Sequence, residues 1–209
     1  MKKPLKKYRL LPQKFYDRDT VKVARDLLGK LLVRKIGRKL LSGVIIETEA
    51  YCANDPACHA ARGKTARNAV MFGPPGRAYV YFVYGNHYCL NAVTESHGIP
   101  GAVLIRALEP VAGIELMRQN RGGAPDKNLT NGPGKLCQAL NIGRAENGCD
   151  LTSDDVTRGG RKKRRQARGH PRWGSLMITN FPFGKFKIDR SPRIGISQAQ
   201  ERLWRFFVA

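Results

Sequence analysis

Two carboxylates and a phenol occupy alternate positions at the end of one apolar run. Glu47, Glu49 and Tyr51 follow Ile45 at a spacing of two residues. Successive side chains of a β-strand point to opposite faces, so these four are expected to share one face of a strand over residues 41–51. A carboxylate fixed on a strand can activate water as a general base or stabilise positive charge on a substrate. This strand is therefore the first candidate for a catalytic site.

A single arginine extends the candidate site. Residues 101–108 have the alternating pattern of a strand, in which Leu104, Arg106 and Leu108 would share one face. A cation among apolar neighbours requires an anion or another acceptor close by. We therefore expect such a partner beside Arg106.

A projecting aromatic side chain is the third feature. Residues 78–94 are aromatic and β-branched on both sides of Gly85-Asn86, which is typical of a β-hairpin. Tyr84 stands just before the turn, with Asn86 and His87 beside it. In a basic protein such an aromatic indicates a wedge that enters between stacked bases. Ordinary packing of the tyrosines across the strands is an equally good interpretation of this stretch alone.

Composition narrows the partner. The 209 residues include 38 Lys and Arg against 16 Asp and Glu, for a net charge of +22, which favours nucleic acid. No apolar run approaches the ~20 residues of a membrane-spanning helix, and no apolar stretch follows the basic residues 1–7 to make a signal peptide. We expect an intracellular protein, cytoplasmic or nuclear, with a single domain.

The cysteines indicate a reducing environment. Five are scattered along the chain, and none is spaced as Cys-x-x-Cys, so reduced thiols are expected. Cys52, Cys58 and His59 could meet a metal, but zinc sites usually have tighter paired spacing. We expect neither a metal nor a cofactor.

The remaining elements position these side chains. Asp19 is expected to cap a helix that ends at Gly29, and residues 31–36 to form a strand. Residues 52–76 read as loops that lead into the hairpin. A helix is expected from Glu109-Pro110 to about Asn120, because proline is favoured in the first helical turn. Late strands are expected over residues 175–179 and 185–189, and a closing helix over 198–207.

Two segments could contact a polyanion. Residues 131–140 predict a glycine-bordered turn into a short helix, where the backbone N–H groups near Gly134, with Lys135, suit a DNA phosphate. Residues 158–172 form the steepest basic run, which fits a solvated insertion and a DNA contact equally well.

Five motifs occur together in a specific order. They are Glu47-Thr-Glu-Ala-Tyr51, the hairpin of residues 81–91, Arg106-Ala-Leu-Glu-Pro110, Gly132-Pro-Gly-Lys-Leu-Cys-Gln-Ala-Leu140 and Arg193-Ile-Gly-Ile196. With them the chain resembles the alkyladenine (3-methyladenine) DNA glycosylase family from about Tyr8 to its C-terminus. The resemblance implies a single α+β domain over residues 8–209, after a basic leader of residues 1–7. It also implies a curved antiparallel sheet, flanking helices and a protruding hairpin.

The resemblance further implies base excision from duplex DNA. An enzyme of this family flips a damaged purine out of the helix and hydrolyses its N-glycosidic bond, here as a monomer. Glu49 would be the general base, assisted by Arg106 and the backbone carbonyl of Ile194. The resemblance also implies a pocket for the flipped base, formed by Tyr51, His59, Tyr81 and Asn91. Asn91 would exclude the 2-amino group of guanine. Tyr84 and Asn86 would intercalate into the DNA.

Two questions stay open at this point. A non-catalytic domain that senses distorted duplexes is the alternative function, although a binder gains nothing from a carboxylate aimed at a polyanion. The hairpin register is the second question: a two-residue loop at Gly85-Asn86 pairs Tyr81 with Leu90, whereas a three-residue loop over residues 85–87 pairs Tyr81 with Asn91. Only the three-residue loop places Tyr81 and Asn91, both expected in the base pocket, on one face. Glu47 is expected to be a structural partner, and Trp173 and Trp204 to pack rather than stack on bases.

Overall fold

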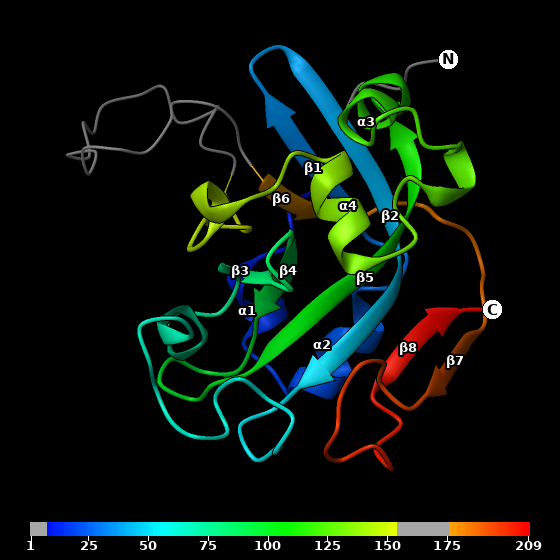
Figure 1. The fold of residues 1–209 in the computed structure, drawn as a ribbon. Helices are drawn as coiled ribbons and strands as arrows, with labels where there is room; N and C mark the ends of the chain where they lie inside the picture. Colours follow the sequence, from blue (N-terminus) through cyan, green and yellow to red (C-terminus); the bar gives the residue numbers. More distant parts are fainter. Residues whose placement is uncertain (1–7, 154–175) are drawn as a thin grey trace.

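The computed structural model describes residues 8–153 and 176–209, and these form one α+β domain built on a curled antiparallel sheet (Figure 1). The strand order is β3-β4-β5-β2-β1-β6, and β8 pairs with both β2 and β7. The strands are β1 (Leu31–Ile36), β2 (Lys39–Tyr51), β3 (Ala78–Val83), β4 (His87–Val93), β5 (Ala102–Ala112), β6 (Leu176–Thr179), β7 (Ile188–Ser191) and β8 (Arg205–Val208). The expected fold class is confirmed.

Short helices flank this sheet. They are α1 (Gln13–Tyr16), α2 (Thr20–Asp26), α3 (Ile114–Asn120) and α4 (Pro133–Ala139), with 3₁₀ turns η2 (Ala69–Phe72), η3 (Asp126–Asn128) and η4 (Arg144–Glu146). In Figure 1, α1 and α2 lie behind β5, and α4 packs against β4 and β5. None of the helices in the described ranges is long and apolar enough to cross a bilayer.

Helix α2 forms as its sequence predicts. The Asp19 carboxylate accepts a hydrogen bond from the backbone N–H of Lys22 at 2.9 Å, which caps the first turn. Val23 and Ala24 are fully buried against the sheet. Gly29, at a φ of 76°, ends this segment in a conformation that favours glycine.

The long strand β2 carries an irregularity that changes the expected faces. Its register against β5 shifts between Ile45 and Thr48. Ile45 therefore packs in the main core, as Thr48 does, and does not share the face of Glu47 and Glu49. For the same reason Leu108 lies in the main core, away from the face of Arg106. A bulge adds an unpaired residue and so reverses the alternation on either side of it.

The helix expected from Glu109-Pro110 to about Asn120 is found only over Ile114–Asn120. Glu109 and Pro110 continue β5, where they pair with Val44 and Gly43 at a register shift that accommodates the proline. Gly113 follows this strand at a φ of 77°, and only glycine fits there, because a Cβ would lie 2.5 Å from a backbone oxygen of β2. Helix α3 begins at the next residue.

The expected closing helix over residues 198–207 is also wrong. Arg205–Val208 is β8, in which aromatic and β-branched side chains occupy a place between β2 and β7. The strand expected over residues 175–179 is β6, whose described residues begin at Leu176. The strand expected over residues 185–189 is β7, which begins only at Ile188.

The hairpin β3–β4 is confirmed, but its register matches neither alternative. The loop is Tyr84–Gly85–Asn86, so Tyr81 pairs with Cys89, and Asn91 pairs with Tyr79. Because a three-residue loop preserves the alternation, Tyr81 and Asn91 still share one face. Tyr84 and Gly85 both have positive φ, 53° and 72°, which moves the turn one residue toward the N-terminus.

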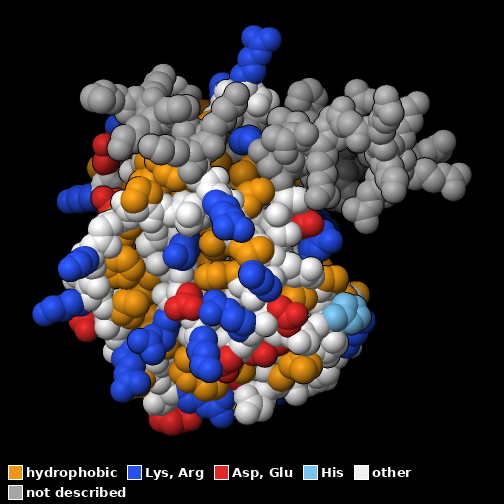
Figure 2. Space-filling view, turned by 180° about the vertical axis from the view of Figure 1, so that it is seen from behind, with side chains coloured by type: hydrophobic (Ala, Val, Ile, Leu, Met, Phe, Trp, Pro, Cys, Tyr) orange, Lys and Arg blue, Asp and Glu red, His pale blue; other side chains and the backbone are white. Residues whose placement is uncertain are grey.

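The face opposite to the view of Figure 1 carries Lys and Arg side chains set among Asp and Glu (Figure 2). Basic charge is therefore not uniform over the described surface. The basic leader of residues 1–7, the basic run of residues 158–172 and Trp173 lie outside the described residues.

Candidate active site

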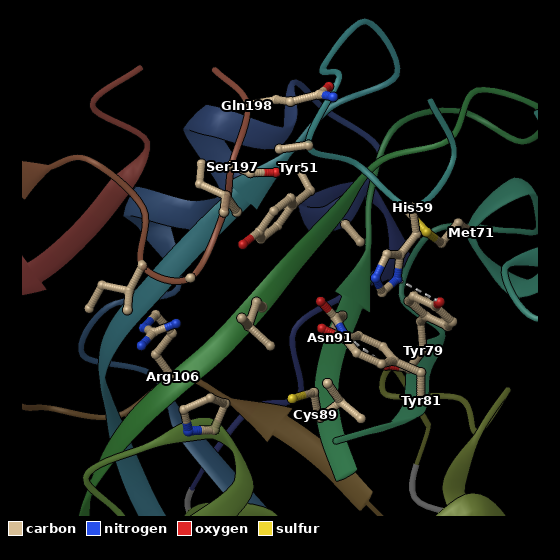
Figure 3. A pocket seen from close by; sticks show the side chains of 18 of the residues that line it. Tyr51, His59, Met71, Tyr79, Tyr81, Cys89, Asn91, Arg106, Ser197 and Gln198 are labelled. Carbon is tan, nitrogen blue, oxygen red and sulfur yellow. Dashed lines mark hydrogen bonds between the residues drawn. The ribbon is translucent and has the colours of Figure 1, made fainter. Parts of the chain in front are cut away.

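A cavity of about 360 Å³ opens where β2, β5 and the β3–β4 hairpin meet the turn at residues 194–198 (Figure 3). Tyr51 forms one side, and the rings of His59, Tyr79 and Tyr81 form the other. The volume falls in the range of small-molecule sites. Planar walls on two sides fit a flat, aromatic ligand.

The Glu49 carboxylate lies directly behind this cavity. It is fully buried, and three groups hold it: the backbone N–H of Ile194 and a guanidinium nitrogen of Arg106 contact Oε1 at 2.8 and 3.2 Å, and the Tyr51 hydroxyl donates to Oε2 at 2.9 Å. All three of these residues line the cavity. Two of these contacts are charge-assisted hydrogen bonds and the Arg106 contact is an ion pair, so the carboxylate is held in one orientation.

The hydrogen-bond capacity of Glu49 is not exhausted. A carboxylate offers about four lone-pair positions. The Ile194 N–H uses one on Oε1, where Arg106 also forms an ion pair, and the Tyr51 hydroxyl uses one on Oε2, so Oε2 retains one acceptor position. Burial, and then the adjacent charge of Glu49, raise the pKa of the Tyr51 phenol, which therefore stays a donor.

Arg106 connects the two carboxylates of β2. Its Nε donates to Glu47 at 2.9 Å, while its other end contacts Glu49. Burial tends to lower the pKa of Arg106, but Glu49 and Glu47 raise it more. Glu47 also accepts from Arg205 at 2.6 Å and does not line the cavity. The expected anion beside Arg106 is thus present, and Glu47 is a structural partner.

The opposite wall is a cluster of rings. His59 and Tyr81 meet edge to face with centroids 4.5 Å apart, and Tyr79 lies 5.3 Å from Tyr81. Asn91 is buried between the walls, and its amide donates to the Tyr79 carbonyl at 3.1 Å. Burial raises the pKa of Tyr81, and raises that of Tyr79 to about 12. The four residues expected to surround a base therefore meet in one cavity.

A buried ion pair supports the Tyr51 side. Arg193 and Asp55 bond each other with both side chains fully enclosed, and Arg193 also donates to the Ala50 carbonyl at 2.9 Å. The Arg193 guanidinium stacks on the Tyr51 ring at 4.7 Å and on Trp204 at 5.2 Å. Arg193 immediately precedes Ile194, so this pair holds both the ring and the amide that contact Glu49.

Tyr84 stands at the mouth of the cavity. It is 83% exposed, and its hydroxyl lies about 4.0 Å from where a Cβ of Gly195 would be, across the opening. Asn86 is exposed beside it on the same loop. The exposed position suits a side chain that reaches into a partner.

The remaining candidates lie outside the cavity. Gly134 packs at the start of α4 against the His87 ring, and Lys135 donates to Asn131 at 2.9 Å. The five cysteines are free thiols. Within residues 8–153 and 176–209, no three His, Cys, Asp or Glu side chains are arranged to hold a metal ion.

The sequence model of the methylpurine-DNA glycosylase (MPG) family matches residues 14–209. The chain belongs to this family. It is 48% identical over 200 residues to the "Putative 3-methyladenine DNA glycosylase" of Carboxydothermus hydrogenoformans, with 95% of each chain covered. The protein of the same name from Methanocella arvoryzae is 48% identical over 203 residues, covering 95% of this chain and 92% of the relative. The expected family is confirmed, and the protein is a DNA glycosylase of DNA repair, which hydrolyses N-glycosyl bonds.

Sequence reasoning missed several residues that line this cavity. Tyr79 and Met71 line the cavity, and Ser197 and Gln198 lie at its rim beside Tyr51 (Figure 3). The place of Tyr79 in the cavity could have been predicted from the sequence, because Tyr79 lies two residues before Tyr81 on the same strand face. The role of Asp55 could not have been predicted from the sequence, since its partner Arg193 is 138 residues away in the chain.

Proposed function

We propose that the protein is a monofunctional 3-methyladenine DNA glycosylase that flips alkylated or deaminated purines from duplex DNA into the described cavity and cleaves them with an activated water. The observation that carries this proposal is the buried Glu49 carboxylate, fixed by three donors behind a cavity with aromatic walls. A domain that only senses distorted duplexes does not require such a carboxylate. We place the enzyme with the DNA of the cell and take it to act as a monomer.

The walls suit a flipped purine. Tyr51 on one side and Tyr81 with His59 on the other would sandwich the base, and the electron-rich faces of these rings favour a cationic alkylated purine. Unstacking a base costs a few kcal/mol. Stacking in the cavity and insertion of Tyr84 into the vacated position would offset this cost.

Three polar groups would complete recognition of the substrate. Asn91 is buried deep in the cavity, where its amide would exclude the 2-amino group of normal guanine. Asn86 would accompany Tyr84 at the interrupted stack. Lys135 and the backbone at Gly134 would contact a DNA phosphate, which fixes the register of the protein on the duplex without reading its sequence.

The chemistry requires one water molecule. The free acceptor position on Glu49 Oε2 would hold a water close to the sugar, aided by the backbone of Ile194. The water oxygen attacks the anomeric carbon, its proton passes to Glu49, and the bond to the base breaks with its electron pair leaving on the purine. The carboxylate and Arg106 also set the electrostatics around the oxocarbenium-like sugar. An alkylated purine already carries positive charge and is a good leaving group.

The product should be an intact strand with an abasic site. None of the described residues that line the cavity is a lysine, so no side-chain amine is placed to form a Schiff base with the sugar. We therefore propose that the enzyme lacks lyase activity.

The test is Glu49→Gln, with Glu47→Gln as the matched control. Glutamine keeps the shape of Glu49 but turns an NH₂ donor toward a site that needs an acceptor. We expect excision from a duplex with one 7-methylguanine or hypoxanthine to slow by roughly 10² to 10⁴, while duplex binding persists. Glu47→Gln makes the same chemical change on the same strand face and should cost much less. Full activity in Glu49→Gln, or a borohydride-trapped adduct of the wild type, would refute the proposal.

A further inference from the structure

A second cavity, of about 430 Å³, lies on the other side of the β3–β4 hairpin from the base cavity at Glu49. The two cavities open at opposite ends of one three-residue loop, because Tyr84 lines the base cavity and Asn86 lines the second cavity. Tyr88 lines the second cavity from the opposite face of the hairpin to Cys89, its neighbour on β4, which lines the base cavity. The loop that is proposed to enter DNA therefore has a cavity on each side.

The second cavity is lined by neutral hydrogen-bonding groups. None of its described lining residues is Lys, Arg, Asp or Glu, and four of them carry carboxamides: Asn86, Asn120, Gln138 and Asn141. The Arg121 guanidinium donates to Gln138 Oε1. Since a guanidinium cannot accept, the Gln138 Nε2 points away from it and can donate to a partner. Gln138 and Asn141 are both exposed, so their amides are accessible.

Basic side chains surround this neutral lining. Lys135 and Arg144 each follow a glycine of the lining, and Arg121 bonds to its glutamine. The acid that follows this segment, Glu146, is buried and paired with Arg34 at 2.6 Å. Neutral donors inside a basic rim suit a sugar–phosphate backbone, whose anionic oxygens accept hydrogen bonds and attract cations.

The position of the loop assigns the second cavity to one DNA strand. A side chain that replaces a flipped base in a duplex has the damaged strand on one side and the undamaged strand on the other. The flipped nucleotide would enter the base cavity on the Tyr84 side. The undamaged strand then lies toward Asn86, where the second cavity opens.

We propose that the second cavity binds the sugar–phosphate backbone of the undamaged strand, with the Gln138 and Asn141 amides as donors and Lys135 as the adjacent cation. This inference rests on the proposed function for the entry of the hairpin into a duplex. The phosphate that Lys135 contacts would then belong to the undamaged strand. The protein would hold both strands while Tyr84 fills the gap between them.

The first test changes Gln138 and measures affinity for a duplex with one tetrahydrofuran residue, an abasic site that cannot be cleaved. Gln138→Ala should weaken binding about two- to tenfold, which corresponds to the loss of one hydrogen bond. Gln138→Glu keeps the shape of the side chain but sets an anion against the phosphate, so it should weaken binding more. Both changes place good helix formers at an exposed position of α4, and thermal unfolding checks that the fold is kept.

Gln119 provides the matched control. It is exposed on α3 and lines neither cavity. Gln119→Ala should leave the affinity unchanged, and Gln119→Glu should weaken it less than Gln138→Glu does. Equal affinities of Gln138→Glu and Gln119→Glu would overturn the proposal.

Neutral phosphates identify the strand. Single methylphosphonates replace successive phosphates of the undamaged strand around the tetrahydrofuran residue, and a parallel series does so in the damaged strand. We expect at least one position of the undamaged strand at which the wild type loses affinity and Gln138→Ala loses less, because its contact is already absent. Additive losses along the whole undamaged strand, or coupling of Gln138 to the damaged strand, overturn the proposal. These measurements require no excision, so their failure is distinguishable from that of the Glu49→Gln test.

Discussion

Tyr51 has two separable roles, one for its hydroxyl and one for its ring, and Tyr51→Phe tests them. The hydroxyl donates to Glu49 Oε2 at 2.9 Å, whereas the ring stacks on Arg193 at 4.7 Å and faces the cavity. Phenylalanine removes the hydrogen bond and keeps the ring. Tyr51→Ala removes both.

The stability cost follows from the burial of Glu49. A hydrogen bond to a charged group contributes about 1.5–3 kcal/mol, and Glu49 has no exposed surface through which bulk water could replace the lost donor. The free energy of unfolding should therefore fall by about 1.5–3 kcal/mol in Tyr51→Phe. A water that enters from the cavity would bring the loss to the lower end of this range.

The catalytic cost should be smaller than the stability cost suggests. Ile194 and Arg106 still hold Oε1, and the loss of Tyr51 gives Oε2 a second free position for water. We expect Tyr51→Phe to slow excision by less than about tenfold. Tyr51→Ala also loses base stacking, worth about 1–3 kcal/mol, and should lose a further 5- to 150-fold in affinity for the lesion.

Two measurements decide the matter. Denaturant unfolding gives the stability of each variant, and single-turnover excision of 7-methylguanine from a duplex gives the rate and the affinity. If Tyr51→Phe lost as much rate as Glu49→Gln, the hydroxyl would be part of the chemistry. If its stability equalled that of the wild type, the hydrogen bond to Glu49 would not form in solution.

Two further predictions concern the wedge and the buried phenols. Tyr84→Ala should weaken binding to a lesion-containing duplex by about 1–3 kcal/mol in a titration and leave the melting temperature unchanged, because Tyr84 is exposed and alanine keeps the strain of its positive φ. A large drop in melting temperature would contradict this. Stability should also fall above about pH 10, since burial raises folded-state phenol pKa values above the unfolded value of 10; each such tyrosine costs about 1.4 kcal/mol per pH unit until its folded pKa is reached. Denaturant midpoints between pH 8 and 11 measure this loss, and a constant midpoint would contradict it. The tyrosines concerned are Tyr16, Tyr51, Tyr79 and Tyr81.

Local pattern was sufficient for the parts of the site that lie on one element. Glu49 and Tyr51 are two residues apart on a strand, so their shared face follows from the period of the strand, and the structure joins them by a hydrogen bond. The hairpin and its exposed Tyr84 also follow from local turn chemistry, although the three-residue loop lies one residue earlier than the expected loop over residues 85–87. The α2 cap is local in the same sense.

Partner strands decided what the local pattern could not. The bulge between Ile45 and Thr48 depends on how β2 pairs with β5, which no property of β2 alone specifies. The segment Arg205–Val208 became a strand because the edges of β2 and β7 were available to it. Secondary-structure propensity is weak enough for such pairing to override it.

The strand that carries the carboxylate and the turn that carries the exposed tyrosine could both be predicted from the chain, because each depends on neighbours one or two residues away. The contacts that hold the carboxylate depend on the folded chain. Ile194 reaches Glu49 from 145 residues further along the chain, and Arg193 reaches Asp55 from 138. Such contacts form when the curled sheet brings distant segments together, so the local periodicity of the sequence does not predict their hydrogen bonds.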